Sequence, residues 1–331
     1  MTDQGKINLE GARPVSLFER ADAAYGLDPR RGGLHHNDAL KVPPVPQNLR
    51  RTQAPAQPQP QPQAGAVPAT NAQTVPPRQA GDAPRAAVAF SGPIAAIDRD
   101  HLRDAGLIVP EEPVTALLEE FRIVKRELLA DARTGGNPLG WRILVCSPLP
   151  GEGKTYCATN LAIALAAERN LEVLLVDADV VKPSIAERLG IAAEYGLMDA
   201  LADPSIAPES LVVRTDIDGL FVLPAGTASS RDAEYLASAH TAAVLDRLTQ
   251  SAGERIVIFD TPPALAASPA AELAQHVGQA LLVARADETS RASLEDAQQL
   301  LSACGDIKLL LNAARYNTSG RRFGAYGTKG N

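Results

Sequence analysis

One ten-residue stretch constrains the fold of this chain most: Cys146-Ser-Pro-Leu-Pro-Gly-Glu-Gly-Lys-Thr155. An apolar run, Ile143 to Cys146, leads into it, and a stretch of small residues typical of a helix, 154–168, leads out. Strand, glycine-bearing loop and helix in this order predict a phosphate-binding loop. Gly151 and Gly153 leave room for backbone N–H groups to point at an anion, toward which the positive end of the helix dipole also points.

Two side chains at the end of this loop would complete an anion site. Lys154 can reach the β- and γ-phosphates of a nucleotide, and Thr155 can offer its hydroxyl to Mg²⁺. Pro148 stands where the standard pattern has its first glycine, so the loop is a variant. The residues expected to contact the nucleotide are Pro150, Gly151, Glu152, Gly153, Lys154, Thr155 and Tyr156.

From Trp141 onward, apolar strand patterns alternate with helical ones. Strands are expected at 142–147, 172–177, 220–224, 255–260, 279–284 and 307–312. Helices are expected at 154–168, 184–189, 232–249, 270–275 and 289–303. The strands are rich in Val, Ile and Leu, as strands covered on both faces are. The fold class predicted is therefore α/β, a doubly wound, mainly parallel sheet of the P-loop NTPase type.

Three carboxylates follow two of these strands. Asp177 and Asp179 come at the end of the second strand, and Asp260 comes at the end of the fourth. A carboxylate there can bind Mg²⁺ or its waters, or accept a proton from an attacking hydroxyl. Each could instead be a helix cap or turn residue. Three carboxylates together beside one phosphate loop favour a site for ATP and Mg²⁺.

Composition limits the other classes of function. The net charge of −7 gives no global basic field for nucleic acid. The three cysteines show no metal-binding spacing and are expected to be buried thiols in a reducing cytoplasm. No apolar stretch reaches transmembrane length and no signal peptide is evident, so we expect a soluble cytoplasmic chain without a membrane span of its own.

The remaining segments predict the domain organisation. Residues 1–41 are mostly polar, with a short helix expected at Val15 to Tyr25; a transient helix and a docking segment for a partner remain equally open. Residues 42–90 are a Pro/Gln-rich linker that cannot bury enough apolar area to order itself. Residues 91–315 form the folded domain, which includes an amphipathic helix from Pro113 to about Ala132, and 316–331 form a flexible tail.

Three stretches together resemble the Walker A, A′ and B motifs of bacterial tyrosine kinases: Ser147 to Thr155, Val173 to Pro183, and Asp260 to Pro263. Further agreement comes from Glu119-Glu-Phe-Arg122, Leu223-Pro-Ala-Gly226, Glu234-Tyr-Leu-Ala-Ser238 and His276-Val-Gly-Gln279. The set is most similar to the exosortase-associated tyrosine autokinases of exopolysaccharide gene clusters. The resemblance covers about residues 95–312 and, weakly, the helix expected near Val15.

The resemblance implies roles for the site residues. Lys154 would contact phosphates, Thr155 would ligate Mg²⁺, and Asp177 would act as base toward a tyrosine hydroxyl. Asp179 and Asp260 would assist Mg²⁺ directly or through water. Asn312, at the end of the last strand, resembles a residue that contacts adenine in related ATPases.

The resemblance also implies partners. Glu119, Arg122 and Lys125 match a helix motif that packs against a neighbouring subunit, so self-association is expected. A membrane chain-length determinant protein would activate the kinase domain, 91–315, and recruit it to the inner face of the cell membrane. Tyr326 and Tyr316 in the tail would be the phosphate acceptors.

Two departures and two rival functions accompany this interpretation. Lys182 stands where the family often has Arg, and the tail holds two tyrosines instead of a cluster. The function expected is a protein-tyrosine autokinase that regulates exopolysaccharide biosynthesis or export. A partitioning or division-site ATPase is one alternative, although Leu149 replaces the second lysine such proteins carry. A nucleotide-binding scaffold without turnover is the other, favoured by the sparse tyrosine tail.

Overall fold

The computed structural model describes residues 87–251 and 253–314. Segment 1–41 with its expected helix, most of the linker, and the tail with Tyr316 and Tyr326 lie outside the described residues. The strands are β1 (Ile94–Ala95), β2 (Arg142–Cys146), β3 (Leu171–Asp177), β4 (Val213–Thr215), β5 (Leu220–Leu223), β6 (Glu254–Asp260), β7 (Gln279–Arg285) and β8 (Ile307–Asn312). The helices are α2 (Arg99–Asp104), α3 (Ala116–Thr134), α4 (Lys154–Ala166), α5 (Ile185–Leu189), α6 (Leu197–Ala202), α7 (Asp232–Leu236), α8 (Ala239–Thr249), α9 (Pro269–Ala274) and α10 (Arg291–Leu300), with 3-10 turns η2 (Pro138–Trp141) and η3 (Pro208–Ser210).

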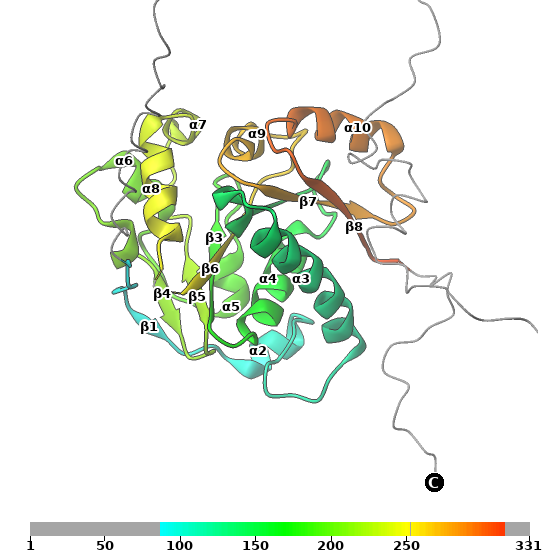
Figure 1. Ribbon diagram of the computed structural model, residues 1–331, viewed down its shortest axis with the longest axis horizontal. Coiled ribbons are helices and arrows are strands. Elements are labelled where there is room, and N and C mark those ends of the chain that lie inside the picture. The colour runs from blue at the N-terminus through cyan, green and yellow to red at the C-terminus, as the bar shows by residue number, and fades with distance from the viewer. Residues whose placement is uncertain (1–86, 252, 315–331) are drawn as a thin grey trace, which may run out of the picture. The chain divides into compact units, whose positions relative to one another are not determined.

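The strands of the described part form one 8-stranded sheet in the order β1-β4-β5-β3-β6-β2-β7-β8. Neighbouring strands are parallel except β4 and β5, which are antiparallel. The crossovers between parallel strands carry the helices, as that connection requires. The predicted fold class, a doubly wound and mainly parallel sheet, is confirmed (Figure 1).

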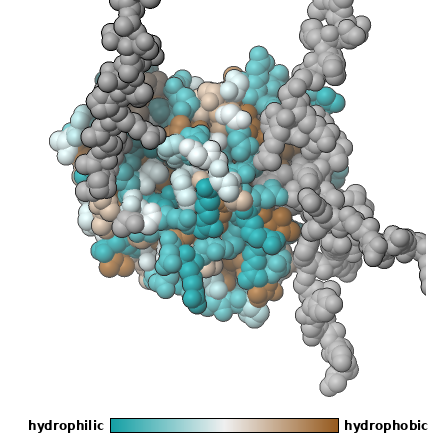
Figure 2. All heavy atoms as spheres, in the orientation of Figure 1, coloured by the Kyte–Doolittle hydropathy of each residue, from teal (hydrophilic) through white to brown (hydrophobic). Residues whose placement is uncertain are grey.

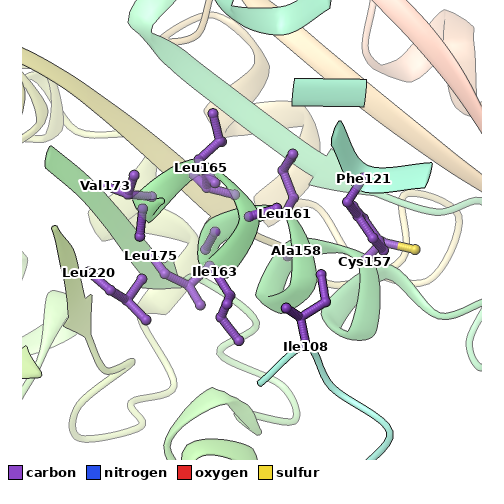
Figure 3. Packing of buried hydrophobic residues seen from close by; sticks show 14 of the residues in the cluster. Ile108, Phe121, Cys157, Ala158, Leu161, Ile163, Leu165, Val173, Leu175 and Leu220 are labelled. Carbon is purple, nitrogen blue, oxygen red and sulfur yellow. The ribbon is translucent and has the colours of Figure 1, made fainter. Parts of the chain in front are cut away.

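Helices cover both faces of this sheet. Val173 and Leu175 of β3 pack in one buried cluster with α2, α3, α4 and α5, and Figure 3 shows them on the side of Leu165 and Ile163 of α4. The alternate residues Leu174 and Val176 belong to a second cluster with α6, α7, α8, α9 and α10. Burying one such side chain contributes about 1.5–3 kcal/mol. Successive side chains of a buried strand therefore pack against opposite helical layers, and each layer covers every second residue.

Two details of the fold differ from the expectation. The helix expected over 232–249 is divided into α7 and α8, because Ser238 adopts extended backbone angles and Thr241 donates its hydroxyl to the Tyr235 carbonyl at 2.7 Å. The short strands β1 and β4 were not predicted, since two and three residues carry too little periodicity.

The first described residues are attached to the sheet by contacts of Phe90 and Arg255. The Phe90 ring is buried and meets Phe221 edge to face, with ring centroids 4.9 Å apart. The guanidinium of Arg255 lies 3.9 Å above the Phe90 ring centroid and donates to the Val88 carbonyl at 2.8 Å. Contacts with the sheet therefore begin at Val88, three residues before position 91.

The surface of the described part is mostly polar. On the face drawn in Figure 2, hydrophilic residues predominate and apolar residues form small separate patches. None of the helices in the described ranges combines the length and apolar character needed to cross a membrane.

Candidate active site

The glycine loop between β2 and α4 has the backbone of an anion site. Gly151 and Gly153 have φ angles of +85° and +97°, in the left-handed region that side chains disfavour. Gly153 caps α4, and no side-chain cap hydrogen bond is present there among the described residues. The N–H groups of the first helical turn and the positive end of the helix dipole are therefore available to a phosphate, as the sequence predicts.

Buried side chains hold the loop in this shape. The carboxylate of Glu152 accepts hydrogen bonds from the Leu149 N–H at 2.7 Å and from the Thr289 hydroxyl. Because the Glu152 side chain is engaged in this way, its backbone N–H is the group that can bind a ligand. The Asn312 amide donates to the Glu152 carbonyl at 2.9 Å. A Cβ at Gly153 would lie 2.0 Å from that amide nitrogen, so glycine is required there. Asn312, expected to contact adenine, thus lies directly on the loop.

Lys154 contacts the carboxylate of Asp179, which follows β3. Its Nζ lies 2.5 Å from Asp179 Oδ2 and 3.4 Å from the Thr155 hydroxyl. The other oxygen of Asp179 accepts from the Lys182 N–H at 3.0 Å, which fixes the turn after β3. Asp179 is therefore held by the cation on one side and by its own turn on the other.

Asp177 is bound by backbone donors. Its Oδ2 accepts from the N–H groups of Ser184 and Ile185 at 2.9 and 3.0 Å, at the start of α5, and its Oδ1 accepts from the Asp179 N–H at 3.2 Å. Burial raises the pKa of Asp177 above its usual range, against the opposing effect of these hydrogen bonds. The carboxylate thus serves as a helix cap as well as a member of the site.

Asp260 is fully buried and lies opposite Asp177 in the β3–β6 register. Neither carboxylate oxygen has a partner with hydrogen-bond geometry among the described residues, although the Thr155 hydroxyl is near enough to lower the pKa of Asp260. Burial raises the pKa of Asp260 to about 7, although the positive charge of Lys154 acts in the opposite direction. An unpartnered buried carboxylate is costly, and a bound cation would compensate it.

The donor set beside the loop fits Mg²⁺. This ion takes hard oxygen ligands, and the Thr155 hydroxyl and the carboxylates of Asp260 and Asp179 supply them. The described residues contain no cluster of three or more His, Cys, Asp or Glu arranged to hold a metal. In P-loop sites, nucleotide phosphates and water complete the coordination of an ion held by few protein groups.

The side chain of Tyr156 has another role. Its hydroxyl donates to the Gly106 carbonyl at 3.0 Å, in the connection between α2 and α3. The ring is half-buried there, so only the backbone N–H of Tyr156 remains for a phosphate.

The three residues expected at a subunit contact differ in their burial and in their partners. Glu119 and Arg122 form an ion pair on the outer side of α3. Lys125 is buried, donates to the Ala164 carbonyl at 2.8 Å and pairs with Glu168 at 2.8 Å. All three line a groove of about 1440 Å³ beside the beginnings of β3 and β6, at the edge of the sheet opposite the glycine loop.

Sequence reasoning missed two residues that contact the loop. Arg285, at the end of β7, donates to the Gly151 carbonyl at 3.3 Å, and Thr289 holds Glu152. Both follow the strand expected at 279–284, so their position at the carboxyl edge of the sheet was an available signal.

Comparison with known proteins identifies relatives. The AAA domain family model matches residues 143–314. The chain is 32% identical over 233 residues to the putative tyrosine-protein kinase EpsB of Ralstonia nicotianae, covering 68% of this chain and 30% of EpsB. It is 31% identical to the tyrosine-protein kinase YwqD of Bacillus subtilis, covering 57% of this chain and 78% of YwqD. The crystal structure of the VpsO kinase domain superposes with a TM-score of 0.52 at 30% identity, covering 66% of this chain and 98% of that domain.

These matches define the relationship and its extent. The chain spans less than a third of the length of EpsB, whereas it matches nearly all of the VpsO kinase domain. The resemblance to bacterial tyrosine kinases that the motifs indicated is thereby confirmed. Since the family model covers more than half of the sequence, this chain belongs to the AAA domain family, and the bacterial tyrosine-protein kinases are its homologues.

Proposed function

We propose that this chain is a protein-tyrosine autokinase that transfers the γ-phosphoryl group of ATP to tyrosine, with Mg²⁺ as cofactor. The observation that carries the proposal is the convergence of one lysine and three carboxylates at an open helix N-terminus. Lys154 and Asp179 lie 2.5 Å apart, and Asp177 pairs in register with the unpartnered Asp260. The names of EpsB and YwqD and the likeness to the VpsO kinase domain support the same activity.

Each residue has a role that follows from its surroundings. The Thr155 hydroxyl and Asp260, assisted by Asp179, would hold Mg²⁺, which when bound offsets negative charge on the phosphate oxygens. Lys154 would exchange Asp179 for the phosphates and orient the transferred group. Asp177 would take the tyrosine proton, which its raised pKa favours. Three backbone N–H groups keep Asp177 in place, so the chain acts mainly by positioning.

The wider role is part of the proposal. The resemblance to exosortase-associated autokinases supports regulation of exopolysaccharide biosynthesis or export. A membrane chain-length determinant protein is the partner we propose, holding the chain at the inner face of the cell membrane. Self-association would bring the Tyr326 segment of one copy within reach of a catalytic site.

The test uses the full chain incubated with Mg·ATP and analysed by mass spectrometry. We expect phosphate mainly on Tyr326, little or none on Tyr316, and none at all in Lys154→Met. Arg291→Met, which removes an exposed cation on α10, is the matched control and should behave like the parent. Asp177→Asn is less informative, because an amide would also disturb the start of α5.

Two outcomes would contradict the proposal. ATP hydrolysis without phosphotyrosine would indicate a partitioning-type ATPase. Nucleotide binding without release of phosphate or labelling of tyrosine would indicate a scaffold.

A further inference from the structure

The groove beside α3, of about 1440 Å³, takes no part in the mechanism proposed above. We call it the α3 groove. Its first wall is α3 with the connection before it, its floor is the end of α4 with the start of β3, and its second wall is the turn between β4 and β5. In Figure 1, α3 and the strands β4 and β5 lie on either side of α4. The volume exceeds the range of about 300–1,000 Å³ typical of small-molecule sites, so a peptide segment suits the groove better.

The walls of the α3 groove are held by contacts within the domain. On the first wall, Glu111 pairs with Arg99 at 2.7 Å. Lys125 joins α3 to the end of α4 through the hydrogen bond and the ion pair described above. On the second wall, the Val173 N–H donates to the Gly219 carbonyl at 2.8 Å, which fixes the turn between β4 and β5 against β3. The groove is therefore formed before any segment binds to it.

Apolar side chains line the first wall and the floor. Val114 is 52% exposed, Leu118 on α3 is half-buried, and Ala167, just after α4, is exposed. Leu118, Arg122 and Arg126 follow one another at four-residue spacing, so α3 presents to the groove a stripe that begins apolar and ends basic. Apolar groups that are exposed together within a hollow indicate a surface that another segment covers.

Three charged residues of the α3 groove are uncompensated. Within residues 87–251 and 253–314, no ion pair is formed by Arg126 on α3, Arg169 after α4 or Asp218 between β4 and β5. The two cations belong to the first wall and the floor, and the carboxylate belongs to the second wall. An occupant that matches the groove therefore has an apolar face with an acidic group on one border and a basic group on the other.

The chain itself leads into the α3 groove. Residues 87–89, the first that the structure describes, line it, and Arg255 donates to the Val88 carbonyl at 2.8 Å. The preceding part of the chain is therefore tethered at this surface. The segment Val15 to Tyr25 lies about 60 residues earlier, and a flexible chain of that length spans roughly 40 Å or more. The tether gives this segment an effective concentration on the order of 1 mM at the groove.

The segment Val15 to Tyr25 has the pattern that the groove requires. At helical spacing, Arg20 and Asp22 fall on opposite borders of an apolar face. That face consists of Leu17, Phe18, Ala21, Ala24 and Tyr25. Phe18 and Tyr25 are the only Phe, Tyr or Trp residues before Phe90. Large side chains of this kind are the usual anchors of a helix that binds in a groove.

We propose that the segment Val15 to Tyr25 binds as a helix in the α3 groove of its own chain. Its two aromatic side chains cover the apolar wall at Val114 and Leu118. Arg20 faces Asp218, and the acidic border of the helix faces the two cations on the other side. The docking uses only the described groove and the residue pattern of the segment, so it does not depend on the proposed kinase activity.

Docking also decides whether Arg122 is accessible. This side chain lines the α3 groove and belongs to the motif that we expect to pack against a neighbouring subunit. The bound segment and the neighbouring subunit therefore exclude each other, and assembly requires the segment to leave the groove. This competition rests on the proposed self-association, whereas the docking itself does not.

Photo-cross-linking within the full chain tests the docking. The photoreactive residue p-benzoylphenylalanine replaces Phe18, the protein is irradiated without nucleotide, and the adducts are located by mass spectrometry. We expect adducts within single chains, on residues that line the α3 groove. The matched control carries the same group at Leu49, which is closer to Ala87 along the chain, so tethering alone would label the groove at least as strongly from there. Equal labelling from both positions, adducts outside the groove, or adducts that join two chains would overturn the docking.

Charge reversal tests how the segment lies in the groove. Asp218→Lys should lower the yield of groove adducts from position 18 by about threefold, because it places a cation opposite Arg20. Arg20→Glu in the same chain should restore the yield, since the pair then has opposite charges again. Asp218 is exposed, and Asp203→Lys, at another exposed carboxylate, is the matched control. A double variant that yields no more adduct than Asp218→Lys alone would contradict the proposed placement.

Sedimentation with Mg·ATP tests the competition. Phe18→Ala should assemble at a concentration about tenfold lower than the parent does, because the segment loses one of its anchors. Leu49→Ala should behave like the parent. An unchanged assembly concentration in Phe18→Ala, or no assembly of either protein, would overturn the competition. Neither the cross-link nor sedimentation measures phosphate transfer, so the docking can fail while the kinase proposal stands, and the kinase proposal can fail while the docking stands.

Discussion

Replacing Asp260 by Asn should make the ligand-free protein more stable, and increasingly so as the pH rises. The buried carboxylate has no partner with hydrogen-bond geometry among the described residues, and burial raises its pKa from 3.8 to about 7. In the unfolded chain the carboxyl ionises near its ordinary pKa. Between these two values the folded state holds a proton that the unfolded state has released, so folding stability falls as the pH rises and the loss is complete above pH 7.

The magnitude follows from the size of this shift. A shift of one pKa unit corresponds to about 1.36 kcal/mol, so the raised pKa of Asp260 lowers the free energy of unfolding by about 4 kcal/mol at pH 8 and by about 2 kcal/mol at pH 5.5. An amide does not titrate, and its own burial costs the same at both pH values. The stability of Asp260→Asn relative to the parent should therefore rise by about 2 kcal/mol between pH 5.5 and pH 8.

Urea unfolding of both proteins at the two pH values, with EDTA and without nucleotide, measures this difference. Asp203→Asn is the control: its exposed carboxylate has a pKa lowered by Ser205, so it is ionised at both pH values and its effect should not change between them. In the presence of Mg·ATP the order should reverse, because only the parent retains the carboxylate that we propose holds the ion. A pH-independent difference for Asp260→Asn would refute the reasoning.

Two further predictions concern the surfaces of the domain. Arg122→Ala should cost only about 0.3–0.5 kcal/mol of stability yet abolish self-association in sedimentation experiments with Mg·ATP; retained assembly would show that the ion pair with Glu119 is only local. Lys125→Ala should instead cost about 1–3 kcal/mol of stability, because it leaves the buried Ala164 carbonyl without its donor. A chain that begins at Ala87 should unfold at the same urea concentration as the full chain, and Phe90→Ala in that shorter chain should lose about 3–5 kcal/mol, because the ring is packed between Phe221 and Arg255; equal stability of these two shorter proteins would contradict this account.

The central strands and the glycine loop could be predicted because their signals are local. Residues 173–176 of β3 are all apolar and buried, and they face the two helical layers alternately. Asp177 ends the strand where it was expected. Other features depend on contacts distant in sequence. Helical spacing places Lys125 near Arg122, but nothing local shows that its ammonium reaches Ala164, 39 residues away.

The residues of the candidate site also divide into those with a local sequence signal and those that depend on distant contacts. The loop pattern identified Lys154, and strand ends identified the carboxylates. The contact of Asn312 with the Glu152 carbonyl, 160 residues earlier, arises only when β8 lies at the end of the sheet beside β7. Resemblance suggested an adenine contact for Asn312, and the structure adds a direct link to the loop backbone. Residue types and spacing cannot reveal such a link, because the two positions have no periodic relation.

The contact between Lys154 and Asp179 has a consequence for nucleotide affinity. The carboxylate of Asp179 lies on the ammonium group that we propose binds phosphate, so under that proposal Asp179 would compete with the nucleotide. The apparent affinity for nucleotide would then be the intrinsic affinity reduced by the fraction of molecules in which Lys154 is released from Asp179. Under the proposed function the free protein should discriminate by charge: a triphosphate should displace Asp179 from Lys154 more readily than a ligand with few phosphate charges, and the released Asp179 would be available to the metal.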